Sequence, residues 1–445
     1  MNILFVSLGC DKNLVDSEVM LGLLKDSGHT LTNDEEMAEV IVVNTCSFIH
    51  DAKEESITTI LEMAELKKEG RCKILIVTGC LAQRYQAEIL EEIPEVDAIL
   101  GTSSYHRIRE AIDEVLDGRK SIHFDSIDDL PKVDISRVVT TGGYVSYLKI
   151  AEGCDKHCTY CIIPKIRGNY RSFPKEDILR DAGRLAGAGV RELNIVAQET
   201  TMYGKDLYGR KVFHELLRDL CKIDGIQWIR ILYCYPEEIT DELIQVIKSE
   251  SKICNYLDIP IQHASDTILK KMGRRTNCQE LLSIIQKLRQ EIPDIALRTT
   301  LITGFPGETQ KDHEALVSFV QKVRFDRLGV FTYSQEEDTP AADMKDQIDE
   351  AVKISRKDEL MQVQQKIAFE LAKKMIGKEV EVLVEGKLPE DNVYIGRTYK
   401  DAPDVDGYIF ISNTKELSSG DIIHVKVVGA NEYDLIGEIN DEFTE

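Results

Sequence analysis

The sequence lacks any long apolar run. No stretch of its 445 residues approaches the roughly 20 apolar residues that a membrane-spanning helix needs. Residues 1–5 carry neither a basic flank nor a small-residue cleavage site, so we expect no secretory signal peptide. The eleven cysteines are an odd number in a chain without an export signal. We therefore expect a cytoplasmic protein, in which thiols bind metals rather than form disulfides.

The sequence is also short of positive charge. It has 55 Lys and Arg against 78 Asp and Glu, which gives a formal net charge of −23. An acidic chain repels phosphate backbones unless it carries a local basic patch. Nucleic acid is therefore not the expected primary substrate, and a basic protein partner fits the charge better. The simpler alternative is that the acidity only keeps the protein in solution.

Three cysteines fall within eight residues, in the order Cys154, Cys158 and Cys161. The alternating apolar run at 144–150 feeds into them, which predicts a strand that ends in a tight loop. A structural zinc ion takes four protein ligands, whereas a four-iron cluster held by three cysteines keeps one iron open. Two alternatives remain at this point: a zinc site that borrows His157 as its fourth ligand, and three unrelated core cysteines.

The first 100 residues contain a loose repeat in which an apolar run ends in a cysteine, at Cys10, Cys46 and Cys80. Continuous apolar runs that alternate with helices indicate a doubly wound parallel sheet, covered on both faces. Sites in such sheets form at the carboxyl ends of the strands, so the three cysteines can converge. Any one of them alone is more simply a core residue. The remaining cysteines show no such register and are interpreted as structural: Cys72, Cys221, Cys234, Cys254 and Cys278.

From residue 144 onward strands and helices still alternate, but each strand–helix unit changes in scale. Six such units predict a partial (βα)6 barrel. The predicted strands are 145–150, 192–198, 228–233, 256–261, 296–302 and 327–333. Such barrels place their chemistry at the carboxyl ends of the strands. Polar side chains at these ends include Gln198, Gln262 and Arg298, and Gly304 lies in a glycine turn after the fifth strand. The basic loop 165–171 either contacts an acidic group or is solvated.

The last part of the chain changes period again. A charged helix is predicted over 349–376, with Gly377 as its C-cap. Residues 378–438 alternate apolar and polar positions between glycine-rich turns, which predicts a small antiparallel β-barrel. Between 376 and 445, sixteen acidic residues stand against six basic ones, a net charge of −10. That sign is wrong for a phosphate-tracking groove and suits a docking surface for a basic protein. We expect three domains, at 1–125, 140–372 and 376–441, with a linker within 117–140.

Two three-cysteine sets, a partial barrel and a terminal β-barrel together resemble the methylthiotransferases, which are radical S-adenosylmethionine (SAM) enzymes. The resemblance covers nearly the whole chain and implies an N-terminal cluster domain, a radical SAM barrel and a C-terminal TRAM domain. It implies two 4Fe-4S clusters, held by Cys10, Cys46 and Cys80 and by Cys154, Cys158 and Cys161. It also implies a SAM pocket at the strand ends, for which we take Gln198, Gln262, Arg298 and Gly304.

Five stretches resemble the branch of this family that methylthiolates the β-carbon of an aspartate of ribosomal small-subunit protein twelve: 7–13, 162–171, 258–263, 333–340 and 401–407. Phe173 departs from the pattern, because an arginine is expected there. The branch implies a basic ribosomal protein as partner, free or on the ribosome, and separate sulfur and electron donors. A radical made from SAM would remove hydrogen from the aspartate carbon. The alternatives are a tRNA adenosine methylthiotransferase and a non-catalytic, metal-bearing ribosome-assembly factor.

Overall fold

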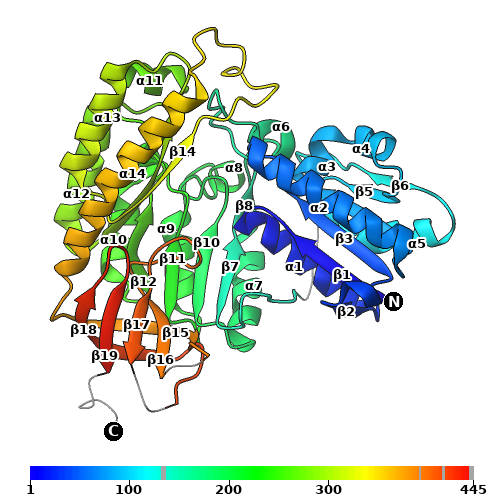
Figure 1. Cartoon of the computed structure of the whole chain (residues 1–445). Helices are drawn as coiled ribbons and strands as arrows, with labels where there is room; N and C mark the ends of the chain where they lie inside the picture. The colour runs from blue at the N-terminus through cyan, green and yellow to red at the C-terminus, as the bar shows by residue number, and fades with distance from the viewer. Residues whose placement is uncertain (132–136, 390–391, 413–415, 440–445) are drawn as a thin grey trace.

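The computed structural model describes residues 1–131, 137–389, 392–412 and 416–439. The centre of the predicted linker and the end of the predicted last domain lie outside these residues. The described chain forms an N-terminal sheet, a larger strand–helix body and a C-terminal barrel (Figure 1). No helix within the described ranges has both the length and the apolar character needed to cross a bilayer.

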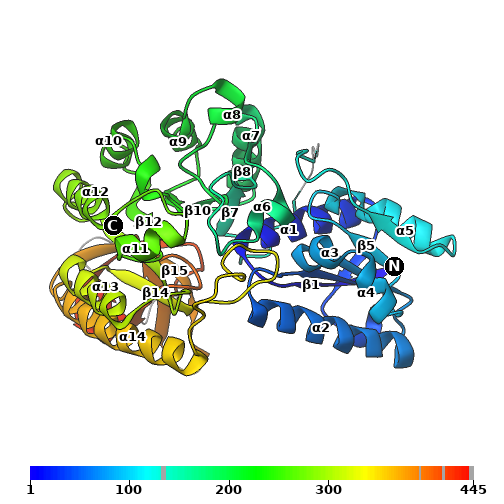
Figure 2. The same ribbon diagram turned by 90° about the horizontal axis from the view of Figure 1, so that it is seen from above.

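The N-terminal part is a six-stranded parallel sheet in the order β2-β1-β3-β4-β5-β6. Its strands are β1 (Asn2–Ser7), β2 (Thr30–Thr32), β3 (Val40–Thr45), β4 (Ile74–Gly79), β5 (Ala98–Leu100) and β6 (Ser121–His123). Its helices are α1 (Asp11–Asp26), α2 (His50–Glu69), α3 (Cys80–Tyr85), α4 (Ala87–Glu92) and α5 (Ile108–Leu116), with short 3-10 turns η1 (Glu35–Met37) and η2 (Tyr105–Arg107). Figure 2 shows α1 and α5 on one side of the sheet and α2 on the other. Separate apolar cores fill the two faces, so the predicted doubly wound sheet is confirmed.

The middle part is an open parallel sheet in the order β14-β13-β12-β11-β10-β7. Its strands are β7 (Val145–Lys149), β10 (Glu192–Val196), β11 (Trp228–Ile231), β12 (Ile253–Asp258), β13 (Ala296–Thr303) and β14 (Arg327–Thr332). The helices are α6 (Ile163–Arg167), α7 (Lys175–Gly187), α8 (Lys205–Tyr208), α9 (Phe213–Cys221), α10 (Asp241–Ser249), α11 (Asp266–Lys271), α12 (Cys278–Glu291), α13 (Gln310–Val323) and α14 (Glu350–Lys373), with η3 (Pro236–Glu238). A small antiparallel pair joins β8 (Ala151–Glu152) to β9 (Arg171–Ser172). The predicted six-stranded partial barrel is confirmed.

The C-terminal part is a closed barrel of five strands in the order β15-β16-β17-β19-β18. The strands are β15 (Glu379–Lys387), β16 (Val393–Thr398), β17 (Ile409–Ser412), β18 (Ile422–Ala430) and β19 (Leu435–Ile439). All neighbours are antiparallel except β17 and β19, which are parallel. A ring with an odd number of strands cannot alternate direction throughout, so the expected antiparallel barrel needs this one parallel pair. Helix α14 (Glu350–Lys373) ends with Lys374 as its C-cap, so the predicted end at Gly377 is three residues too late, and Gly377, with a φ of 86°, lies in the turn that follows.

Buried ion pairs attach the C-terminal barrel to the middle sheet. Arg397 donates to Glu192 at 2.7 Å, and Arg230 donates to the same carboxylate at 2.8 Å. All three side chains are fully buried. Around them, Leu383 and Ala402 of the barrel join an apolar core with residues of β7, β11 and β12. The C-terminal barrel, orange and red in Figure 1, is therefore fixed to the body of the molecule.

Candidate functional site

Cys10, Cys46 and Cys80 each come at the carboxyl end of a strand. Cys10 lies between β1 and α1, Cys46 follows β3, and Cys80 opens α3 directly after β4. These three strands are parallel neighbours in the sheet. The structure therefore places the three cysteines together at one edge of the sheet, as the repeat predicts.

A left-handed glycine packs the Cys10 loop against Cys46. Gly9 has a φ of 88°, and a Cβ atom added there would lie 2.7 Å from the Cys46 Cβ atom. Glycine is thus needed both for its backbone angle and for space. Burial raises the pKa of Cys46 to about 12, with the nearby thiols of Cys80 and Cys10 adding to the effect. Three crowded thiols can lose their protons together only when a cation compensates the charge, as a metal centre does.

The second trio lies in the loop between β8 and α6. Cys154 and Cys158 are buried and Cys161 is partly buried. His157, between them, adopts a left-handed backbone with a φ of 51°. Burial raises the pKa of Cys154 to about 12, and the neighbouring Glu199 and Cys158 add to the effect. Each trio therefore has two buried thiols that disfavour one another as anions, with Cys161 partly buried in this loop and Cys10 exposed in the first trio.

The spacing of the sulfur atoms bears on the zinc alternative. In a tetrahedral zinc site, sulfur atoms 2.3 Å from the metal lie about 3.8 Å from each other. In neither trio do the three sulfur atoms all lie within 4.8 Å of one another, and no described histidine completes such a group. His157 is exposed. Within the described residues, neither trio therefore forms a ready-made tetrahedral zinc site.

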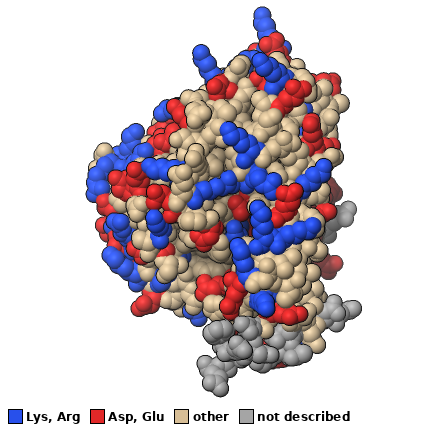
Figure 3. Space-filling view, turned by 90° about the vertical axis from the view of Figure 1, so that its left-hand side faces the viewer, with Lys and Arg blue, Asp and Glu red and all other residues tan. Residues whose placement is uncertain are grey.

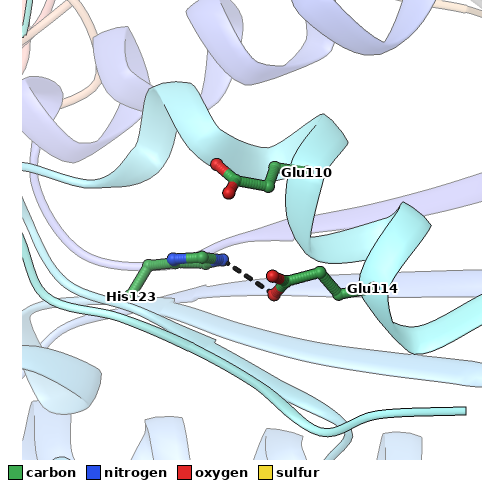
Figure 4. Close-up of side chains that lie close together, drawn as sticks. All are labelled: Glu110, Glu114 and His123. Carbon is green, nitrogen blue, oxygen red and sulfur yellow. Dashed lines mark hydrogen bonds and ion pairs between the residues drawn. The ribbon is translucent and has the colours of Figure 1, made fainter. Parts of the chain in front are cut away.

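A closer group of metal-type ligands lies away from both trios, at Glu110, Glu114 and His123 (Figure 4). These side chains already have partners. Glu114 accepts hydrogen bonds from Ser121 Oγ at 2.6 Å and interacts with His123 Nε2 at 3.1 Å. Glu110 is exposed and paired with Arg107 at 2.9 Å. We assign them a structural role.

One cysteine of the first trio lies at the contact between the N-terminal sheet and the middle part, beside the segment that follows the second trio. Cys80 packs against Ile162 and Ile166, and Ile162 directly follows Cys161. Figure 2 shows α6, which carries Ile166, beside α1 and α3, and Arg167 at the end of α6 contacts Asp16 of α1. One short helix therefore links the second trio to a cysteine of the first.

The segment after β11 also reaches both trios. Tyr233 has a left-handed φ of 59°, and its hydroxyl donates to Asp11, the residue after Cys10, at 3.2 Å. Two residues later, the hydroxyl of Tyr235 lies 3.8 Å from the Cys158 sulfur atom. The end of this strand thus lies against the two sets of cysteines.

Arg167 is buried within the basic loop 165–171, so this part of the loop is not solvated. Its guanidinium donates to Asp16 at 2.7 Å and to Asn13 Oδ1 at 2.5 Å, both on α1. It also lies 3.5 Å from the Cys80 sulfur atom. The sequence pattern did not indicate the two partners on α1, because they lie 151 and 154 residues away along the chain.

Lys149 extends the same buried network. It pairs with Asp16 and, at 2.7 Å, with Glu152. The predicted SAM contact Gln198 donates to Glu152 at 2.7 Å, and its Oε1 atom is buried without a partner. The sequence did offer a signal here, since a lysine at the end of a buried apolar strand requires a nearby carboxylate.

Gln262 and Gly304 lie at neighbouring strand ends. Gln262 has a φ of 71° and bridges to Leu301 of β13. The N–H of Gly304 donates to Glu308 at 2.5 Å, and a Cβ atom there would lie 2.1 Å from Lys353 Cγ. The glycine turn is therefore held by a buried carboxylate and leaves no room for a side chain.

Two further sequence positions lie elsewhere. Arg298 donates to Asp258 at 3.0 Å and pairs with Asp406 of the C-terminal part at 3.4 Å, so its observed contacts join the two parts. Its role as a SAM contact stays a prediction. Phe173 donates its N–H to the Ile150 carbonyl and packs against the main core.

Burial of His263, next to Gln262, should make the free energy of unfolding depend on pH. It is fully buried, and burial lowers its pKa to about 3. Because the unfolded chain binds this proton more readily, the stability from neutral His263 is present above about pH 6.5 and lost as the pH falls toward 3. Between about pH 5.5 and 4, we expect the free energy of unfolding to fall about 1.4 kcal/mol per pH unit more steeply in the native chain than in His263→Gln.

Urea denaturation at several pH values measures this difference in slope. His50→Gln is the matched control, because His50 is an exposed histidine. Its slope should equal that of the native chain. A His263→Gln slope that also equals the native one would contradict the assignment.

Profiles of three known families match successive parts of the chain. An uncharacterized protein family, UPF0004, matches residues 2–101, the radical SAM superfamily matches 148–320, and the TRAM domain matches 376–439. The first two cover the two cysteine trios. The third covers the five-stranded barrel.

A relative from Lachnoclostridium phytofermentans, named ribosomal protein uS12 methylthiotransferase RimO, is 68% identical over 98% of this chain and 99% of its own. The chain belongs to this methylthiotransferase family. Family members of the same name from Clostridioides difficile and Acetivibrio thermocellus are 53% and 52% identical, over 97% and 98% of both chains. The family resemblance seen in the sequence is confirmed.

Solved structures support the fold of this family member. The radical SAM methyltransferase TsrM from Kitasatospora setae matches with a TM-score of 0.55 at 13% identity, over 87% of this chain and 79% of that one. The cobalamin-dependent SAM radical enzyme OxsB matches with a TM-score of 0.51, also at 13% identity, over 82% and 56%. At this identity the likeness shows the shared fold alone.

Proposed function

We propose that this radical SAM methylthiotransferase transfers a methylthio group to the β-carbon of an aspartate of ribosomal protein uS12. The observation that carries the proposal is the contact of Cys80, from the first trio, with Ile162, the residue that follows Cys161 of the second trio, and with Ile166 of α6. A chemistry that needs both a hydrogen-removing centre and a sulfur-carrying centre requires such an arrangement. Relatives of that name, which are 68% and 53% identical over 98% and 97% of this chain, support uS12 as the substrate.

Six cysteines would hold the two centres: Cys10, Cys46 and Cys80 for one 4Fe-4S cluster, and Cys154, Cys158 and Cys161 for the other. A cluster held by three thiolates offers one open iron, which would take SAM at the second trio and an exogenous sulfur at the first. The crowded, buried thiols fit this anionic ligand set. The protein's own part is to bind and orient these groups and to exclude water.

The network around Arg167 sets the relative position of the two centres. Arg167 and Lys149 belong to the middle part, and Asp16 belongs to α1 of the N-terminal part. All three side chains are buried. Breaking one of these pairs leaves a buried charge without compensation, so the two parts are held together in one arrangement.

SAM contacts are proposed at the strand ends of the middle sheet. Gln198 has a buried Oε1 atom without a partner, which can accept a hydrogen bond from a ligand. Gln262 and Gly304 present backbone groups in left-handed conformations at the adjacent ends. As part of the same proposal we keep the domain boundaries 1–125, 140–372 and 376–441.

The charge of the C-terminal barrel supports a basic protein as substrate, but the surface is not acidic everywhere. Figure 3 shows lysines and arginines interleaved with acidic side chains over the face that carries α12, α13 and α14. Exposed Lys366, Lys373 and Lys374 of this region lie in or just after α14. A tRNA substrate is therefore the alternative to test directly.

Deletion of the gene should remove the methylthio group from uS12 and leave the methylthiolated adenosine of tRNA unchanged. The measurement is mass spectrometry of both substrates from the deletion strain. The native gene should restore the modification on uS12. Loss of the tRNA modification with unchanged uS12 would instead support the tRNA alternative. Loss of neither, with zinc in place of iron in the purified protein, would support a non-catalytic assembly factor.

A further inference from the structure

Among the described residues, nine lysines and arginines are buried. Eight of them have a carboxylate oxygen within 4.0 Å: Lys12, Lys149, Lys156, Arg167, Arg230, Lys353, Arg356 and Arg397. The ninth is Arg274, which lies just after α11. It has no carboxylate oxygen within that distance. A buried guanidinium without an anion is costly, so this position calls for a negative charge from another source.

The contacts of Arg274 show where that charge would come from. One amino group of its guanidinium donates to the Pro260 carbonyl at 2.9 Å, and the other donates to the Cys158 sulfur atom at 3.9 Å. The guanidinium stacks over the ring of Tyr235 at 4.3 Å, and its Nε atom is buried without a hydrogen-bond partner. Glu237 also acts on Arg274 without forming an ion pair, so the source of negative charge in direct contact is the thiolate set of the second trio.

The first trio also has a buried arginine, but its charge is already balanced. Arg167 lies 3.5 Å from the Cys80 sulfur atom and is paired with Asp16 and Glu152. Lys149 is paired with the same two carboxylates. Two cations and two anions sum to zero beside the first trio. Beside the second trio, Lys156 is paired with Glu199, Glu237 and Glu238, so Arg274 is the cation there that contacts a cysteine without a carboxylate partner of its own.

We propose that Arg274 is a positioning residue that supplies the counter-charge of the metal centre on the second trio and directs the incoming electron to it. This inference rests on the proposed cluster ligands. One electron, from a low-potential one-electron reductant, would enter that centre. No bond is formed or broken, and Arg274 keeps its proton. A nearby positive charge stabilises the more negative, reduced state, whereas the balanced charges around Arg167 give the first centre no such advantage.

The test is a redox titration of the reconstituted full-length protein with dithionite, followed by electron paramagnetic resonance without SAM. Serine replacements of each trio assign the two signals. In Arg274→Gln, the ratio of reduced to oxidised second centre at a fixed potential should fall at least tenfold, which is about 59 mV for one electron. The first centre should not change. Arg274→Lys keeps the charge and should restore most of the ratio. Arg275→Gln, at the exposed neighbouring arginine, should change neither centre.

Each outcome separates the inference from the proposed function. Full iron content with an unchanged ratio in Arg274→Gln, together with weaker SAM binding, would overturn the inference and make Arg274 a SAM ligand. Equal shifts at both centres would also overturn it. Iron absent from the native protein would instead remove the proposed cluster ligands. If Arg274→Gln does not fold, Arg274→Lys provides the test. A tenfold or larger fall in its ratio of reduced to oxidised second centre would overturn the inference, because lysine keeps the positive charge.

Discussion

Replacing Cys10, Cys46 and Cys80 together by serine should lower the iron content from about eight to about four atoms per chain. Methylthiolation of uS12 should be lost, while reductive cleavage of SAM should remain. The physical reason is that the first trio would lose its thiolate ligands, whereas the second trio has its own loop and its own buried neighbours. Anaerobic iron and sulfide analysis, with SAM cleavage assayed in parallel, measures both results.

The reciprocal variant and a neutral control complete this experiment. Serine at Cys154, Cys158 and Cys161 should also leave about four irons but abolish SAM cleavage. Cys278→Ser should change neither quantity, because this partly buried cysteine lies at the start of α12, outside both trios. Iron that stays near eight in the first variant, with normal circular dichroism, would show that those three cysteines are not ligands.

The second large effect is expected where the C-terminal barrel joins the middle sheet. Glu192 is fully buried and is shared by Arg230 and Arg397. Glu192→Gln leaves the buried Arg230 guanidinium without a carboxylate and Arg397 with Glu385 as its remaining partner, so we expect the free energy of unfolding to fall by about 3–5 kcal/mol. Arg397→Met should cost less, because Glu192 keeps Arg230 as a partner. Urea denaturation of the purified holoprotein measures both.

An exposed ion pair provides the comparison for these buried charges. Arg210 and Glu215 form such a pair on the surface, and Arg210→Met should change the free energy of unfolding little, because water screens an exposed ion pair. If Glu192→Gln lowered the free energy of unfolding as little as Arg210→Met, the buried charges of Arg230 and Arg397 would not depend on Glu192. A larger loss for Arg397→Met than for Glu192→Gln would contradict the shared role of Glu192.

Sequence periodicity predicted the sheets well, and with them the meeting of distant cysteines. In a parallel sheet the carboxyl ends of neighbouring strands share one edge, so Cys10, Cys46 and Cys80 could be placed together from the strand pattern alone. The boundary of the C-terminal barrel could also be predicted. Strands before it are continuous apolar runs, whereas its own strands alternate apolar and polar residues between glycine-rich turns. These features depend on local sequence, which a single chain displays directly.

Long-range polar contacts could not be predicted in the same way. Helix α1 begins at Asp11, directly after Cys10, and its polar residues Lys12 and Asn13 are buried rather than solvated. Arg274 had no signal, since its partners come from other strands and loops. Polar residues buried by contacts between parts of a chain look in sequence like ordinary loop residues.

The open edges of the middle sheet limit which fragments of this protein can fold on their own. A sheet that does not close leaves rows of unpaired N–H and C=O groups along its outer strands, here β7 and β14. In the whole chain, α1 lies against β7 and α14 lies against β14. A fragment that begins after the N-terminal part would bare β7 and could pair with other copies edge to edge. Aggregation of such fragments, rather than independent folding, is the consequence of this architecture.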